Sequence, residues 1–344
     1  MNKKLYLLLL LLLISATSSF AQSVDLNFNG LGFLDNREYK AFIPRSHTFS
    51  GTRTAFDVGL NIDSLNHFVV GVNGLHEFGA KPFWGAVDPV AYYRFQSKTW
   101  LFFGGEFPRE GLTTDFPRAM LNDTLRYYRP NIQGLLAQYV SPSGQFTETG
   151  FIDWLSRQTD VDREQFVFAA KGKYSPVAGG TFYIVHYFEM MHDAGAAILL
   201  PDDHIGDNGA FEIKLGLDFT RKQTAFDSLS FEAGTLVSLE RERGVDGFKT
   251  PKGFVFNAYA SFGHFAVFEE FYRGQGSNIT LGDSYYSKPV YNRIDLIYTP
   301  FMFKRLRGSF IASFHFSPAQ FNDNQEAFRI TYDLGRKVIA RFKD

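Results

Sequence analysis

The residue pair that could support nucleophilic chemistry is a hydroxyl beside a histidine. Ser313 and His315 stand two residues apart, so they share a face if the segment is a strand. A histidine can activate a serine to attack an ester. The chain contains no Gly-x-Ser-x-Gly motif, and a polar histidine more often only lines a surface. We therefore expect no catalytic residues and no enzyme activity, with a hydrolase as the alternative.

Histidines and carboxylates gather in two polar segments, where a bound metal ion is the chemistry to consider. Segment 151–165 mixes acidic residues with arginines, and segment 186–204 holds His186, His192, Asp202, Asp203 and His204. A metal site needs several such groups to converge, and neither spacing matches a zinc or calcium motif. We expect no metal and no other cofactor, but a salt-bridged corner and a hydrated loop.

A third segment, 106–130, mixes arginines with carboxylates and is stiffened by three prolines. Where such charges face one another across a narrow passage, they create a transverse field that selects ions. A plain surface loop with scattered charges is the alternative. The charged residues of interest are Glu106, Arg109, Asp115, Arg118, Asp123, Arg126 and Arg129.

The elements that must position these residues are β-strands, because apolar and polar residues alternate with period two. In segment 210–220, Phe211, Ile213 and Leu215 fall on one face, and Glu212 and Lys214 on the other. The pattern predicts about sixteen strands, with fourteen or eighteen as alternatives. They lie near 24–34, 53–63, 66–76, 87–96, 99–107, 124–140, 146–156, 163–174, 181–191, 209–220, 227–240, 253–262, 265–273, 290–300, 306–316 and 326–342.

Strand length and aromatic placement decide between a lipid-facing barrel and a soluble sandwich. Many predicted strands have nine residues or more, which suits a tilted membrane-spanning strand, whereas strands of soluble sheets average five or six. Aromatic residues crowd the strand ends, where an interfacial girdle belongs. Short connections such as 97–98 alternate with long ones such as 108–123. We expect an all-β protein: a closed antiparallel transmembrane barrel.

The polar faces of these strands carry many charges, which predicts a wet interior. An unpaired charge in a dry interior costs several kcal/mol, but about sixteen strands enclose a lumen wide enough for water. The residues expected to line this lumen are Arg53, Asp57, Lys171, Glu212, Lys214, Asp218, Arg293, Asp295, Arg329 and Asp333.

The export signal and the composition of the chain limit the compartment in which the protein is expected and the partners that it is expected to bind. Residues 1–21 begin with lysines, continue through an apolar run and end in small residues, as a cleaved export signal does. The rest, 22–344, is expected to be a single barrel domain. The chain has no cysteine, which excludes disulfides and a lipid anchor at a cysteine. It has 35 Lys+Arg against 36 Asp+Glu, which gives no reason to expect nucleic acid.

In strand number, loop rhythm and the aromatic Phe342 near its end, the mature chain resembles the porin-like class of Gram-negative outer-membrane barrels. The resemblance implies passive diffusion of small hydrophilic solutes through the lumen. It also implies that the loop after the fifth strand, with the charges of segment 106–130, folds inward and narrows the pore. The partners would be outer-membrane lipid and the solutes. The sequence does not decide whether the protein forms a homo-oligomer. The alternatives are a barrel enzyme acting on lipid or lipopolysaccharide and a non-conducting structural barrel.

Substitutions at two neighbouring positions test these expectations most directly. If Leu215 faces lipid, Leu215→Arg should abolish assembly. If Lys214 lines a wet pore, Lys214→Glu should leave assembly intact and alter permeation.

Overall fold

The computed structural model describes residues 22–40, 44–198, 203–220, 225–318 and 320–342. The expected export signal, residues 1–21, lies outside the described residues. In the described part of the chain, no helix is long and apolar enough to cross a membrane.

Nearly all regular structure is β-strand, with two short helical turns, α2 (Leu125–Tyr128) and η1 (Ser284–Ser287). The strands are β1 (Ser23–Glu38), β2 (His47–Asn61), β3 (Asn66–Glu77), β4 (Ala86–Gln96), β5 (Trp100–Pro108), β6 (Asn131–Val140), β7 (Phe146–Ser156), β8 (Gln165–Tyr174), β9 (Phe182–Asp193), β10 (Gly206–Asp218), β11 (Ser228–Glu242), β12 (Lys252–Phe262), β13 (Phe265–Gly274), β14 (Val290–Met302), β15 (Leu306–Ser317), β16 (Gln320–Asp333) and β17 (Lys337–Arg341).

The strands close into one antiparallel barrel. Each strand from β1 to β16 pairs with its neighbour in sequence, and β1 also pairs with β16, from Asn29 opposite Asp333 to Glu38 opposite Asn324. This closure confirms the predicted sixteen-strand barrel. The predicted last strand, 326–342, is broken at Gly335, whose φ of 64° suits glycine, so that β17 continues separately along the start of β1.

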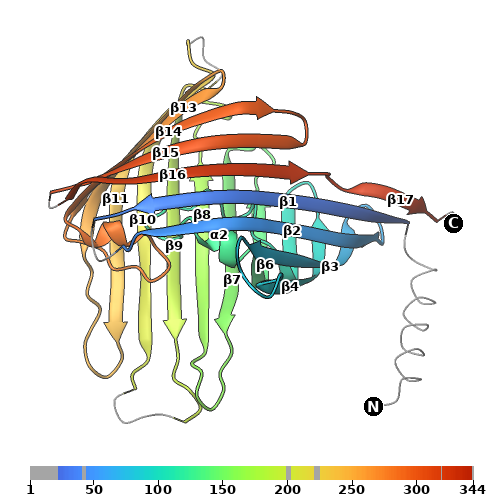
Figure 1. The fold of residues 1–344 in the computed structure, drawn as a ribbon, viewed down its shortest axis with the longest axis horizontal. Coiled ribbons are helices and arrows are strands. Elements are labelled where there is room, and N and C mark those ends of the chain that lie inside the picture. The colour runs from blue at the N-terminus through green and yellow to red at the C-terminus, as the bar shows by residue number, and fades with distance from the viewer. Residues whose placement is uncertain (1–21, 41–43, 199–202, 221–224, 319, 343–344) are drawn as a thin grey trace.

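The connections give the barrel two different ends (Figure 1). One end carries tight turns such as 263–264 between β12 and β13, together with the start of β1 and the end of β17. The other end carries longer connections, among them 109–130, 194–205, 243–251 and 275–289. This asymmetry is typical of outer-membrane barrels, in which the longer loops are extracellular.

Apolar side chains cover the outside of the barrel. On β10, Phe211, Ile213, Leu215 and Leu217 are between 38% and 56% exposed. Their cross-strand partners on the same face are apolar as well: Leu215 lies opposite Ile184 and Ala233. The alternation therefore assigns the faces of β10 correctly, and the apolar face points away from the barrel interior.

The polar faces point inward, as predicted, but most of their charges are not hydrated. Six of the ten residues expected to line a wet lumen are only 1% to 4% exposed: Arg53, Asp57, Glu212, Lys214, Arg293 and Asp295. Lys171, Asp218 and Arg329 are half-buried, and Asp333 is exposed. The expected water-filled lining thus needs correction, because loops folded into the barrel cover these charges and most of them pair with opposite charges of the wall.

Candidate functional site

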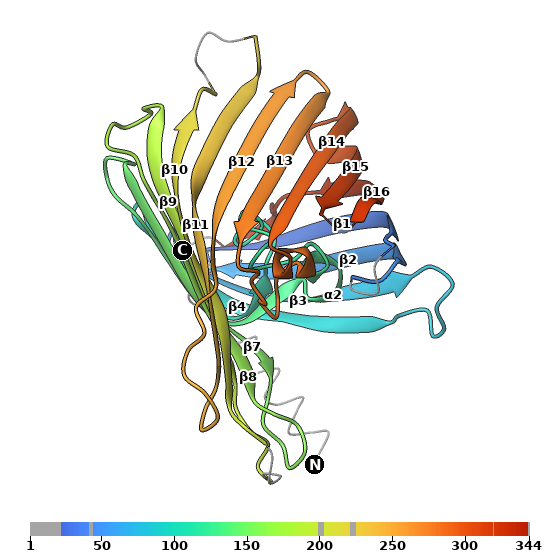
Figure 2. The same ribbon diagram turned by 90° about the vertical axis from the view of Figure 1, so that its left-hand side faces the viewer.

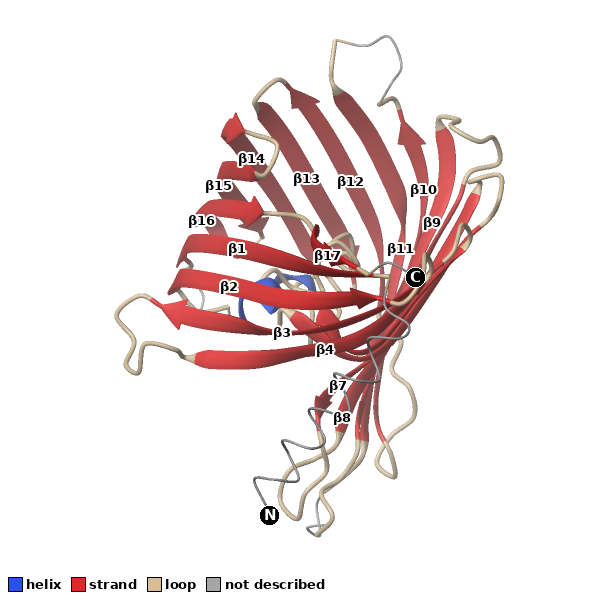
Figure 3. Cartoon of the chain, turned by 90° about the vertical axis from the view of Figure 1, so that its right-hand side faces the viewer, coloured by secondary structure: helices blue, strands red, loops and turns tan. Residues whose placement is uncertain are grey.

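The connection between β5 and β6, residues 109–130, lies inside the barrel, where Figures 2 and 3 show α2 within the ring of strands. Tyr127 of α2 is completely buried and stacks on Phe33 with ring centroids 4.3 Å apart. Its hydroxyl donates to Asp35 at 3.2 Å and accepts from Arg329 Nε at 2.9 Å. The barrel wall thus provides hydrogen-bond partners for the buried hydroxyl of this tyrosine.

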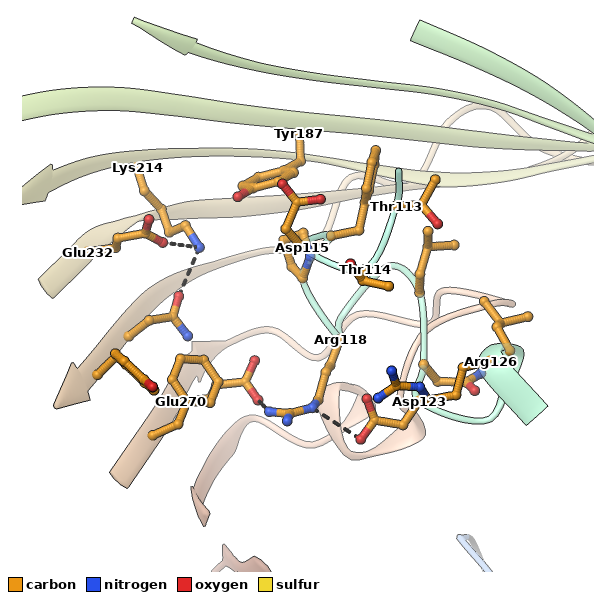
Figure 4. A pocket seen from close by; sticks show the side chains of 18 of the residues that line it. Thr113, Thr114, Asp115, Arg118, Asp123, Arg126, Tyr187, Lys214, Glu232 and Glu270 are labelled. Carbon is orange, nitrogen blue, oxygen red and sulfur yellow. Dashed lines mark hydrogen bonds and ion pairs between the residues drawn. The ribbon is translucent and has the colours of Figure 1, made fainter. Parts of the chain in front are cut away.

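Arg118 joins this loop to the opposite wall (Figure 4). Its guanidinium donates to Glu270 of β13 and, at 2.8 Å, to Asp295 of β14. Both carboxylates are almost fully buried, with side chains 5% and 1% exposed. Charge-assisted hydrogen bonds in a buried site are stronger than surface ion pairs, so Arg118 fixes the position of the loop in the lumen.

Asp123 of the same loop lies among three arginines. The distances from its Oδ2 to nitrogens of Arg118, Arg293 and Arg329 are 3.5, 3.6 and 3.6 Å. Burial alone raises the pKa of the Asp123 carboxyl, but the arginines outweigh it and hold that pKa well below its usual range. The carboxylate is therefore a fixed negative charge inside the barrel, near β14 and β16.

A second inward loop, residues 275–289 with η1, packs on the first, and its inward path was not predicted. The backbone N–H of Asn122 donates to the Leu281 carbonyl, and that of Asp283 to the Arg118 carbonyl, both at 2.8 Å. Tyr285 of η1 stacks on His315 at 4.6 Å. Together the two loops fill much of the lumen with buried side chains.

The charged residues predicted for the constriction do not face one another as a group, and each contacts a different part of the protein. Arg109 pairs with buried Asp153, Asp115 with Lys171, Arg126 with Glu110 at 3.3 Å, and Arg129 donates to the carbonyls of Leu155 and Trp154 at 3.4 and 3.3 Å. Glu106 does not point into the barrel with these residues, so its predicted place in the constriction is wrong. Its neighbour Phe107 is completely buried inside, so alternation turns Glu106 outward, where it accepts from Gln133 at 3.2 Å.

A cavity of about 370 Å³ is left between the inward loop and strands β9 to β13. Lys214 lies in its wall, 2.9 Å from Glu212, 2.7 Å from Glu232 and 2.9 Å from the Asn257 side chain. Figure 4 shows Lys214 and Glu232 on one side of the cavity and Arg118 with Glu270 on the other. The cavity is thus lined by paired charges of both signs.

Ser313 and His315, considered above as a possible nucleophile and base, each contact another residue. His315 Nδ1 lies 2.8 Å from the Tyr291 hydroxyl, while Ser313 accepts from Arg293 at 3.1 Å. In the part of the chain that the structure describes, no three His, Asp or Glu side chains are grouped to hold a metal. In segment 151–165, Arg163 pairs with Asp193 at 2.7 Å and with Asp203, a salt-bridged corner as expected. Asp202 lies outside the described residues.

A polar cluster lies on the outer face of the barrel, at the end with the longer connections. We name it the rim cluster: His192, Asp207, Arg241 and Arg243. His192 of β9, Asp207 of β10 and Arg241 of β11 are direct cross-strand neighbours on that face. His192 Nδ1 lies 3.0 Å from Asp207 Oδ1, and the Phe166 ring lies 5.1 Å from the imidazole. The Asp207 side chain is 5% exposed, and that of His192 is 21% exposed.

The rim cluster has the geometry of a base with its orienting carboxylate. Because Asp207 engages Nδ1, the ring nitrogen available to another molecule is Nε2. The two arginines that also contact Asp207 provide donors for an anionic oxygen. In the sequence, His192 stands out only as a candidate metal ligand and Asp207 does not stand out, since the pair forms across the connection 194–205 and has no local motif.

Comparison with known families gives one match. The family described as lipid A 3'-O-deacylase-type matches residues 15–338. No curated protein matches the chain.

Solved structures of porins share this fold. OprD of Pseudomonas aeruginosa has a TM-score of 0.55 at 10% identity, covering 93% of this chain and 97% of that chain. OccK2 (OpdF) of the same organism, solved with glucuronate, has a TM-score of 0.54 at 11% identity, covering 92% and 98%. A BenF-like porin from Pseudomonas fluorescens Pf-5 has a TM-score of 0.53 at 11% identity, covering 92% and 99%. At such identities the likeness concerns the fold alone, which is that of Gram-negative outer-membrane barrels.

The family match overturns the expectation that the protein is not an enzyme, because the family is named for an enzymatic activity. The expectation rested on the absence of a nucleophile motif. A site assembled from separate strands has no such motif in the sequence, so the criterion was unsuited to this fold.

Proposed function

The chain belongs to the lipid A 3'-O-deacylase-type family, and on that premise we propose that it hydrolyses an acyl ester of lipid A or a closely related lipid. The substrate would lie in the outer leaflet of the outer membrane, with the longer connections on the extracellular side. Such an enzyme needs its reactive groups on the outer face, at the height of the lipid headgroups. The rim cluster lies on the outer face at the end with the longer connections, and this position carries the proposal.

The proposed reaction uses His192 as general base. Nε2 takes a proton from water as the water oxygen bonds to the ester carbonyl carbon. The carbonyl oxygen becomes an oxyanion, which a guanidinium of the rim cluster stabilises. When the carbon–oxygen bond to the sugar breaks, Nε2 returns the proton to the leaving alcohol. Asp207 keeps the imidazole in the required tautomer and orientation.

His192→Ala is expected to lower the rate of lipid A deacylation at least 100-fold, because general base catalysis contributes about 10²–10⁴. The measurement is mass spectrometry of lipid A incubated with the purified, folded barrel, following loss of one acyl chain. His186→Ala is the matched control. His186 also faces outward on β9 beside a carboxylate, 3.3 Å from Glu148, but it lies toward the tight-turn end. Equal activity of both variants would refute the role of His192, and an inactive wild type would refute the hydrolysis.

A second candidate function is passage of small hydrophilic solutes through the lumen. The sixteen-strand porin fold and the charged cavity of about 370 Å³ support it. The inward loop 109–130 would then limit the passage, with Arg118 holding it against Glu270 and Asp295. Arg109, Asp115, Asp123, Arg126 and Arg129 would contribute to ion preference.

Arg118→Ala is expected to raise single-channel conductance or shift ion selectivity, because it frees the loop from the wall of the lumen. Planar-bilayer recording of the purified protein measures both. Arg126→Ala is the control for conductance, since Arg126 belongs to the same loop but pairs with exposed Glu110 of that loop and not with the wall. Currents that stay the same in both variants would count against this passage.

A further inference from the structure

The two arginines of the rim cluster are held in an unusual arrangement. Arg243 donates to Asp207 through Nε at 2.8 Å and Nη2 at 2.9 Å, and Arg241 through Nε at 3.1 Å and also through Nη2. Each guanidinium has five N–H donors. Each presents one edge to Asp207, and Arg243 Nη2 also lies 3.4 Å from His192 Nδ1, so the Nη1 groups take no part in these contacts.

The cluster carries excess positive charge although Asp207 is buried. One carboxylate faces two guanidinium groups, which leaves a net charge of +1 before any proton on His192 is counted. The side chains of Arg241 and Arg243 are 29% and 46% exposed, whereas Asp207 is 5% exposed. The charge of the second guanidinium is therefore not compensated within the cluster, and both guanidinium groups are accessible from outside it.

The surroundings indicate which kind of anion fits. The Arg241 guanidinium lies over the Phe248 ring, 4.2 Å from its centroid. Along the same outward face of β10, away from the rim, follow exposed Phe211 and Ile213. A cationic rim above an apolar wall matches a lipid with an anionic headgroup and acyl chains. Arginine pairs best with phosphate and carboxylate oxygens, and phosphate offers the higher charge.

We propose that Arg241 and Arg243, aligned by Asp207, bind a phosphate group on the headgroup of an outer-leaflet glycolipid. Asp207 acts as a positioning residue that holds both guanidinium groups side by side. The proposal deepens the proposed function by adding an anchor next to His192. It rests on that function only for the choice of a lipid A-type headgroup, since binding requires no ester cleavage.

The test measures binding of lipid A by native mass spectrometry of the full-length barrel in detergent micelles. The probes are lipid A that carries its phosphates and the same lipid A after phosphatase treatment. Arg241→Gln/Arg243→Gln is expected to weaken binding of the phosphorylated probe at least tenfold and to leave binding of the dephosphorylated probe unchanged. The control is Arg273→Gln, because Arg273 is exposed on the outward face near the corresponding end of β13. Equal affinities of the double variant and the control, or of the two probes for the wild type, would overturn the proposal.

Asp207→Asn distinguishes a specific phosphate-binding site from non-specific electrostatic attraction to a basic patch. It raises the net charge of the cluster by one, because the carboxylate charge is lost, and it replaces one of the two oxygens that align the arginines with an NH2 donor. We expect at least fivefold weaker binding of phosphorylated lipid A, in a variant that still assembles. Unchanged or tighter binding would refute the positioning role and leave a non-specific basic patch.

Two further experiments distinguish lipid phosphate from free phosphate as the ligand, and the proposed hydrolysis from the proposed phosphate binding. Inorganic phosphate is expected to compete only at concentrations far above that of the lipid, and competition at equal concentration would make free phosphate the ligand. Phosphate-dependent binding without deacylation would refute the hydrolysis and leave the anchor standing. Deacylation with binding unaffected by the double variant would refute the anchor alone.

Discussion

Leu215→Arg is expected to abolish assembly of the barrel. Leu215 is 56% exposed on the outer face of β10, between Ile184 and Ala233. In a membrane this surface contacts hydrocarbon, where an arginine costs about 2–4 kcal/mol at the midplane and less toward the interfaces. The substitution also removes leucine burial in lipid, which contributes about 1.5–3 kcal/mol. The sum is comparable with the whole stability of many proteins.

The measurement is the fraction of protein in the membrane that migrates as the folded, heat-modifiable species on gels. Leu215→Ala serves as the control, because it shortens the side chain without placing a charge in lipid. Wild-type assembly of Leu215→Arg together with Leu215→Ala would show that this face does not contact hydrocarbon.

Lys214→Glu is expected to destabilise the barrel severely, although the sequence alone predicted that it would be tolerated. Lys214 is 4% exposed and lies between the Glu212 and Glu232 carboxylates. A glutamate there would bring three carboxylates together and remove their only ammonium partner among the described residues. Breaking a buried ion pair costs about 3–5 kcal/mol, and the added like charge increases this cost.

The stability of the variant can be followed as the urea concentration at which the folded species is lost. Lys173→Glu provides the matched control. Lys173 is also an inward-facing lysine, but it is exposed near the tight-turn end of β8 and contacts the Tyr183 ring. We expect Lys173→Glu to unfold close to wild type. Equal urea midpoints for wild type and Lys214→Glu would mean that water reaches Lys214.

Much of the barrel could be predicted from the sequence because strand faces obey a local rule. Side chains alternate with period two, so Phe211 and Lys214 are assigned to opposite sides without knowledge of any other strand. The rule assigns the faces correctly, however, only when one residue of the strand is known to point inward or outward. Glu106 was grouped with the constriction although the neighbouring Phe107 points inward and turns it outward.

The candidate sites could be predicted only in part. The inward path of segment 109–130 followed from a resemblance to porins, but its partners could not, since Glu270 and Asp295 lie more than 150 residues away in the chain. The pairing of His192 with Asp207 depends on the register between β9 and β10. Register is set by the whole sheet and by the connection between the strands.

By itself, the sequence determined that the chain forms a closed cylinder with an apolar outside and a polar inside, because alternation and strand length are local properties of each segment. Only the tertiary structure decided how wet that inside is and where its charges find partners. Two loops fold into the lumen and bury Arg293, Asp295 and Lys214. Burial and pairing depend on groups brought together from distant strands, and no spacing along the chain records them.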